Sequence, residues 1–208
     1  MLNKPRLSRS FFDRDTLMVA RELLGCKLVH IENGKKISGI IIESEGYCGE
    51  TDLGCHAKAG RTKRTSVMYG PPGFPFVYFT YGNHWMFNTV TREVDQPEAV
   101  LIRGIIPTEG IDIIESRRGK QPRKLWTDGP GKLAQALGLN GEHNNLDLTT
   151  GDATLFIEKG ISIPNRFVTT SPRIGLYSVP EPWKSIPWRY LAKLPEEWLS
   201  KNLLEEHK

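Results

Sequence analysis

Two carboxylates and a phenol stand at alternate positions in the segment ESEGY, which follows the apolar run GIII. Alternate residues of a strand share a face, so Glu43, Glu45 and Tyr47 are predicted to point the same way. Ionised carboxylates are costly to bury without partners, so this face is either a solvated strand edge or a polar site. A carboxylate in such a site can activate a water molecule.

Arg103 lies inside the apolar segment VLIRG and therefore needs a partner. Its charge cannot be removed by a pKa shift, so burial requires a carboxylate close by. Glu45 is the natural candidate. A structural ion pair is the alternative interpretation.

The segment VYFTYGNHWMFN is rich in aromatic residues. Tyr78 and Tyr81 flank the end of a predicted strand, and Asn88 follows ten residues after Tyr78. Such aromatic residues usually pack in the core or on a sheet face. Beside basic loops they can also stack on an extruded base or fill the gap that it leaves.

The chain is mildly basic, with a formal net charge of +4 over 208 residues. Its basic residues cluster in two stretches, which are a solvated surface in the simplest interpretation and phosphate-binding loops in the other. The first stretch holds Lys58, Arg61, Lys63 and Arg64, and the second holds Arg117, Arg118, Lys120, Arg123 and Lys124.

The three cysteines, Cys26, Cys48 and Cys55, are an odd number with no secretory signal, so we expect reduced thiols. No apolar run approaches the roughly 20 residues that span a bilayer. We therefore expect a cytoplasmic protein without membrane contact.

The order of expected elements favours one α+β domain over residues 1–208, built on a curved, mostly antiparallel sheet with flanking helices. The turn Asn33-Gly34 predicts a hairpin, and residues 48–73 predict a long functional loop. Helices are expected at 13–24, 108–118 and 129–138. Strands are expected on both sides of the Asn33-Gly34 turn, at 74–91 with a break at 81–83, at 99–107, in ATLFIEKG and in RIGLY.

Taken together, these segments resemble the alkyladenine, or 3-methyladenine, DNA glycosylases. The resemblance runs from about Leu7 to Leu191. The matching segments are IIESEGYCG, CHAKAGRTKRT, MYGPPGFPFVYFTYG, the FN that contains Asn88, AVLIRG, GPGKL, RIGLY and PWRY.

The resemblance implies a role for each candidate residue. Glu45 is similar to the general base that deprotonates the attacking water, and Arg103 to the arginine that helps to hold this water. Tyr47 and His56 resemble the pair that lines one face of the flipped base, with Tyr78 on the other face. Asn88 resembles the residue that excludes the 2-amino group of guanine.

The resemblance also implies a DNA-binding surface. Tyr81 resembles the residue that enters the duplex through the minor groove and fills the space of the extruded nucleotide. Arg61, Arg64 and Lys132 are candidate phosphate contacts. Lys132 is also the nearest candidate for an amine nucleophile, but the family is monofunctional, so we expect an abasic site as product and an intact strand.

The expected function is thus a monofunctional DNA glycosylase of base excision repair that removes alkylated or deaminated purines. We expect no cofactor, double-stranded DNA with damaged purines as partner, and a monomer. The location would be the nucleoid in a bacterium or the nucleus in a eukaryote.

Two other classes of function remain. A metal hydrolase could use Cys48, Cys55, His56 and Glu45, although adjacent ligands at 55 and 56 do not match common zinc patterns. A non-catalytic nucleic-acid-binding module could use the same tyrosines and basic loops. Glu45 argues against such a module, because a carboxylate weakens phosphate binding.

Overall fold

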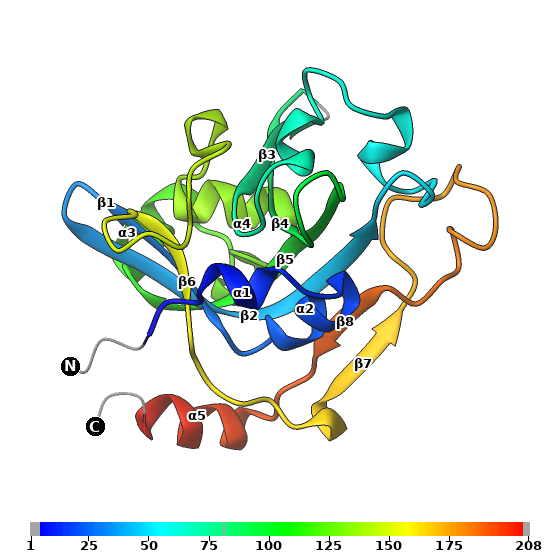
Figure 1. Ribbon diagram of the computed structural model, residues 1–208. Helices are drawn as coiled ribbons and strands as arrows, with labels where there is room; N and C mark the ends of the chain where they lie inside the picture. The colour runs from blue at the N-terminus through cyan, green and yellow to red at the C-terminus, as the bar shows by residue number, and fades with distance from the viewer. Residues whose placement is uncertain (1–4, 81, 206–208) are drawn as a thin grey trace.

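The computed structural model describes residues 5–80 and 82–205, which form an α+β fold around an open, eight-stranded antiparallel sheet (Figure 1). The strands run in the order β3-β4-β5-β2-β1-β6, and β7 and β8 add to β2. This confirms the expected fold class. The strands are β1 Lys27–Glu32, β2 Lys35–Cys48, β3 Pro75–Thr80, β4 His84–Thr91, β5 Glu98–Glu109, β6 Leu155–Glu158, β7 Val168–Ser171 and β8 Arg189–Ala192.

The long strand β2 organises the sheet. Its first half pairs with β1 and its second half with β8, while β5 runs along its other edge. Asn33 and Gly34 both have positive φ, 50° and 75°, as a two-residue hairpin turn of type I′ requires, so the expected β1–β2 hairpin is confirmed.

Five helices lie in the part of the chain that the structure describes, and α2 packs against β2 and β5 while α4 packs against β4 and β5. The expected helix at 129–138 is confirmed, because α4 begins at Pro130 and the left-handed Gly138 ends it. The helices are α1 Arg9–Phe12, α2 Thr16–Glu22, α3 Ile111–Arg118, α4 Pro130–Leu137 and α5 Glu196–Glu205.

The helix expected over 13–24 is present with narrower bounds, as α2 at Thr16–Glu22. The separate helix α1 at Arg9–Phe12 lies before the expected range and was not predicted. Asp15 directly precedes α2. Its side chain accepts hydrogen bonds from the backbone N–H groups of Leu17 and Met18, both at 3.0 Å, which is the geometry of an N-cap.

Two further expectations need correction. Strand β5 continues through Pro107 to Glu109, and the helix after it begins only at Ile111. Proline is tolerated there because the β2–β5 pairing is irregular between Ser38 and Gly39, opposite Pro107. The segment RIGLY is a turn and not a strand, since Gly175 takes a positive φ of 86°.

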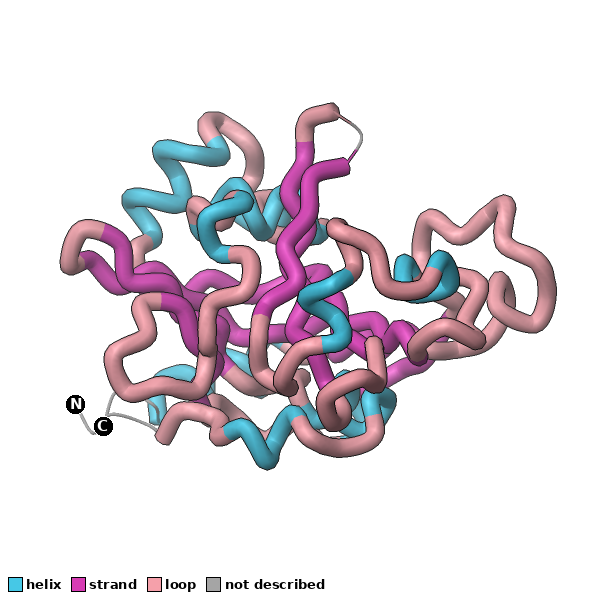
Figure 2. The backbone as a smooth tube through the Cα atoms, turned by 45° about the horizontal axis from the view of Figure 1, so that its top comes forward, coloured by secondary structure: helices cyan, strands magenta, loops and turns pink. Residues whose placement is uncertain are grey.

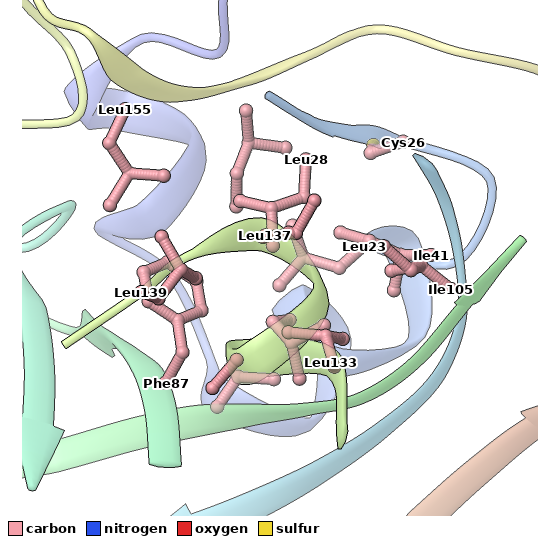
Figure 3. Packing of buried hydrophobic residues seen from close by; sticks show 14 of the residues in the cluster. Leu23, Cys26, Leu28, Ile41, Phe87, Ile105, Leu133, Leu137, Leu139 and Leu155 are labelled. Atoms are coloured by element: carbon pink, nitrogen blue, oxygen red, sulfur yellow. The ribbon is translucent and has the colours of Figure 1, made fainter. Parts of the chain in front are cut away.

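The core fills the space between the sheet and α2 and α4. Figure 3 shows Leu133 and Leu137 of α4 near Phe87 of β4 and Leu23 after α2. At the other end of the chain, α5 is attached through Trp198, whose ring lies 5.5 Å from that of Phe167. No described helix is long and apolar enough to cross a bilayer.

Candidate active site

One face of the sheet carries most of the residues that the sequence singled out. In antiparallel register Glu45 lies opposite Leu101, Leu101 opposite Asn88, and Asn88 opposite Phe76. Directly paired residues share a face, so this row crosses four strands on one side of the sheet. Tyr47 and Tyr78, each two residues along their strands from the row, share that face.

Glu45 is fully buried and is held by four protein contacts. Its Oε2 accepts a hydrogen bond from the Tyr47 hydroxyl at 2.8 Å, and its Oε1 accepts one from the backbone N–H of Ile174 at 2.7 Å. Arg103 approaches both oxygens, with Nε at 3.3 Å from Oε1 and Nη1 at 3.4 Å from Oε2. The expected pairing of Arg103 with Glu45 is therefore present.

Arg103 is shared with a second carboxylate. Its Nε also donates to Glu43 at 2.8 Å, and Arg189 of β8 donates to the same Glu43 oxygen at 2.7 Å. Two carboxylates and two guanidinium groups thus balance in charge. This pairing offsets the free energy that is needed to remove these charged groups from water.

These surroundings set the protonation of Glu45 and Tyr47. Burial raises the pKa of Glu45 above its ordinary value, against the lowering effects of Arg103, the Ile174 N–H and the Tyr47 hydroxyl. Burial and the Glu45 charge raise the pKa of Tyr47 well above its ordinary value, so its hydroxyl stays protonated and donates. A carboxylate with a raised pKa is a stronger general base once ionised.

A small pocket opens beside Tyr47. It has a volume of about 230 Å³, its open mouth included. The ring of Tyr78 lies 4.6 Å from that of His56 and 5.0 Å from that of Phe76, measured between centroids. The pocket is lined by Tyr47, Cys55, His56, Met68, Phe76, Tyr78, Asn88 and Ala99.

The loop after β2 delivers His56 to this pocket. His56 begins a short 3₁₀ turn, and the residue is exposed. Partial burial of the imidazole, and then the charges of Arg64 and Lys58, lower the pKa of His56 to about 4. The loop is anchored by a second apolar cluster: Cys55, Ala57, Met68, Tyr69, Phe76, Val90 and Ala99.

Asn88 lines the pocket and is fixed in position. It is buried, and its Nδ2 donates to the carbonyl of Phe76 at 3.0 Å. A side-chain amide held to the backbone of the neighbouring strand presents a rigid wall to whatever enters the pocket.

The candidate DNA contacts lie in three different places. The guanidinium of Arg64 lies over the Tyr78 ring, 4.9 Å from its centroid. Arg61 and Lys132 each form an exposed ion pair, with Asp95 and Asp128 respectively, both at 2.7 Å. Exposed ion pairs are weak, so a phosphate can compete for these cations.

Tyr81 lies outside the described residues. The strands on either side of it are described, and β3 ends at Thr80 while β4 begins at His84. Figure 2 shows this hairpin projecting from the body of the protein. Lys132 belongs to the α4 N-terminus, next to Gly131, which packs against His84 at the start of β4.

The sequence interpretation missed Arg173, Ile174 and Asp52. Arg173 is buried and forms a two-pronged ion pair with Asp52. The signal that drew attention to Arg103, an arginine inside an apolar segment, is weaker here, because Arg173 follows Ser171-Pro172 and stands at the edge of RIGLY.

The metal-hydrolase interpretation finds no matching ligand set. Across residues 5–80 and 82–205, no group of three or more His, Cys, Asp or Glu side chains is arranged to hold a metal ion. Cys55 is buried, and burial raises the pKa of its thiol to about 12. The three cysteines are free.

Comparison with known proteins shows the family to which the chain belongs. Residues 10–195 match the family model described as methylpurine-DNA glycosylase. Three bacterial relatives are provisionally named 3-methyladenine DNA glycosylases. The protein of Carboxydothermus hydrogenoformans is 43% identical over 187 residues, covering 90% of this chain and 95% of its own.

The second relative, from Chlamydia felis, is 44% identical over 192 residues, covering 90% of this chain and 96% of its own. The third, from Myxococcus xanthus, is 43% identical over 183 residues and 88% of each chain. With these matches spanning nearly the whole length, the chain belongs to the methylpurine-DNA glycosylase family and is an enzyme of the DNA glycosylase class.

Proposed function

We propose that the protein extrudes damaged purines from duplex DNA and hydrolyses the N-glycosidic bond with a water activated by Glu45. The observation that carries this proposal is a fully buried carboxylate, held by Arg103, whose Tyr47 partner lines an aromatic pocket. The product is an abasic site in an intact strand. Damaged duplex DNA is the partner, and the protein acts as a monomer.

The chemistry passes through a sugar with oxocarbenium character, as in other glycoside hydrolyses. The water oxygen bonds to C1′ of the sugar, the C1′–N bond breaks, and its electron pair leaves with the base. Glu45 takes the proton of the water and stabilises the positive sugar. An alkylated cationic purine leaves as a neutral base, whereas hypoxanthine needs a proton or a hydrogen bond at its ring.

Glu45 keeps room for the attacking water. A carboxylate offers roughly four lone-pair positions, and the Tyr47 hydroxyl, the Ile174 N–H and Arg103 Nη1 occupy three of them. The single Nε–H of Arg103 is donated to Glu43 and leaves the fourth position open. The Arg103 Nη1 contact is the longest, at 3.4 Å. We infer that the water inserts between Arg103 and Glu45 and is held by both.

The pocket must also open before a base can enter it. A base stacked between two rings needs about 7 Å, twice the roughly 3.4 Å spacing of stacked bases. The rings of His56 and Tyr78 are only 4.6 Å apart and lie edge to face. Binding therefore separates these rings, with Tyr47 and His56 on one face of the base and Tyr78 on the other.

Selectivity then has three sources. The aromatic walls attract a cationic base by roughly 0.5–2 kcal/mol. The Asn88 amide, which is fixed in position, excludes the 2-amino group of guanine by steric clash. Damaged bases also pair less well and cost less to extrude. Deaminated purines such as hypoxanthine depend on the last two sources, because they carry no charge.

The test uses duplexes that each contain one 7-methylguanine, hypoxanthine or ethenoadenine. We expect the free damaged base to be released and identified by mass spectrometry, with strand cleavage only after hot alkali. Binding without release of any base, including from alkylated genomic DNA, would overturn the proposal and favour a non-catalytic binding module.

A further inference from the structure

Arg173 joins two segments that are far apart in the sequence. It lies in residues 172–188, termed here the closing segment, which forms the orange loop beside the end of β2 in Figure 1. Its side chain is buried, and Nη1 and Nη2 donate to the two oxygens of Asp52 at 2.5 and 2.8 Å. Nη1 also donates to the carbonyl of Gly46 at 3.0 Å.

Asp52 is itself fixed. It is fully buried and accepts hydrogen bonds from the backbone N–H groups of Cys48 at 3.1 Å and Gly54 at 2.8 Å. These bonds close the turn that follows β2. The ion pair therefore attaches the closing segment to a rigid point just beyond the strand that carries Glu45.

The guanidinium of Arg173 also supports the pocket wall. It lies over the ring of Tyr47, 4.7 Å from the centroid, and 5.1 Å from that of Trp188. Space for it depends on Gly54, where an added Cβ would stand 2.7 Å from Nη2. The residue at position 54 thus controls whether the guanidinium can reach Asp52.

Fixing Arg173 also fixes the residue that follows it in the chain, Ile174. The backbone N–H of Ile174 donates to Glu45 at 2.7 Å, and Arg173 is covalently attached to it. We propose that Arg173, through Asp52, is a positioning residue that holds the Ile174 N–H on Glu45 and the Tyr47 ring in place. This inference rests on the proposed role of Glu45 as the general base.

Three variants disturb the attachment in different ways. Arg173→Gln combined with Asp52→Asn removes both buried charges, so neither is left unpaired. Gly54→Ala keeps both charges and displaces the guanidinium. Arg173→Lys keeps the charge and loses the two-pronged geometry. The matched control replaces the ion pair of Arg117 and Glu32, beside the opposite end of β2, by two glutamines.

The first measurement is hydrogen exchange at the Ile174 amide, which needs no catalysis. We expect exchange at least about tenfold faster in the double variant and in Gly54→Ala, and unchanged in the control pair. The second measurement is the single-turnover rate of base release. It is expected to fall roughly 10²-fold while the Kd for the lesion duplex stays within about threefold, with partial recovery in Arg173→Lys.

The inference is overturned if the Ile174 amide exchanges no faster in the double variant than in wild type. It is also overturned if the double variant loses DNA affinity by the same factor as it loses rate, or if the control pair loses as much rate as the double variant. If the wild-type protein releases no damaged base, the proposed function fails. The Ile174 exchange then still decides whether Arg173 holds the closing segment.

Discussion

Arg103 faces Glu45 across neighbouring strands, with its Nε 3.3 Å from the carboxylate Oε1, and both side chains are buried. A guanidinium at this distance favours the ionised carboxylate, whereas burial disfavours it. Burial dominates, so the pKa of Glu45 stays above its ordinary value. In the function proposed above, this raised pKa makes the ionised Glu45 a stronger base than an exposed carboxylate.

The first prediction concerns pH. A general base works only when ionised, so base release should rise with pH through the raised pKa of Glu45, above the ordinary 4.5, and be lost below it. Glu43→Gln removes a negative charge that raises this pKa. The acidic limb of the single-turnover profile for 7-methylguanine should therefore move to lower pH. A limb that stays in place or moves upward would contradict this assignment.

The second prediction concerns the pocket wall. Tyr78→Leu removes an aromatic face, so excision of cationic 7-methylguanine should fall roughly 3–30-fold more than excision of neutral hypoxanthine. Phe79→Leu is the matched control, because Phe79 is exposed and the neighbouring position on a strand points to the opposite face. Equal losses on the two lesions, measured by single-turnover kinetics, would exclude a cation–π contribution from Tyr78.

The third prediction concerns Lys132, which forms an ion pair with Asp128. Borohydride should trap no covalent complex with a lesion duplex, because hydrolysis uses water and not an amine. Lys132→Ala should keep the rate of base release, weaken DNA binding and reduce the slope of log K against log salt by about 1. A trapped complex that disappears in Lys132→Ala would instead show a lyase step.

The fourth prediction concerns the core beneath the sheet. Leu133 of α4 is fully buried, so Leu133→Ala should lower the free energy of unfolding by about 2–5 kcal/mol, measured by urea denaturation. Leu133→Met, which preserves volume, should cost less than about 1.5 kcal/mol. A loss below about 1 kcal/mol in Leu133→Ala would show that the site collapses around the smaller side chain.

Much of the candidate site could be predicted from local pattern. Alternation along β2 placed Glu43, Glu45 and Tyr47 on one face, and a buried arginine demanded a carboxylate, so the Arg103 contacts were expected. The hairpin turn at Asn33 and the start of α4 at Pro130 follow from local backbone preferences.

The missing parts depend on contacts between distant segments. Ile174 reaches Glu45 across 129 positions, and Arg173 reaches Asp52 across 121. A periodic pattern of residues along the sequence gives no information about a contact between segments so far apart. The continuation of β5 through Pro107 depends on the irregular pairing with β2 and not on the proline itself. The helix α1 was not predicted because its four residues are too few to show a helical repeat of apolar positions.

The most direct test of the account compares Glu45→Gln with Glu43→Gln in single-turnover base release at the pH optimum of each protein. Both carboxylates contact Arg103, but only Glu45 accepts the hydroxyl of Tyr47 at the pocket. We predict that Glu45→Gln lowers the rate roughly 10²–10⁴-fold with lesion-duplex binding retained, and that Glu43→Gln stays within about tenfold of wild type. A Glu45→Gln protein that still releases base within about tenfold of the wild-type rate would contradict the central role of Glu45.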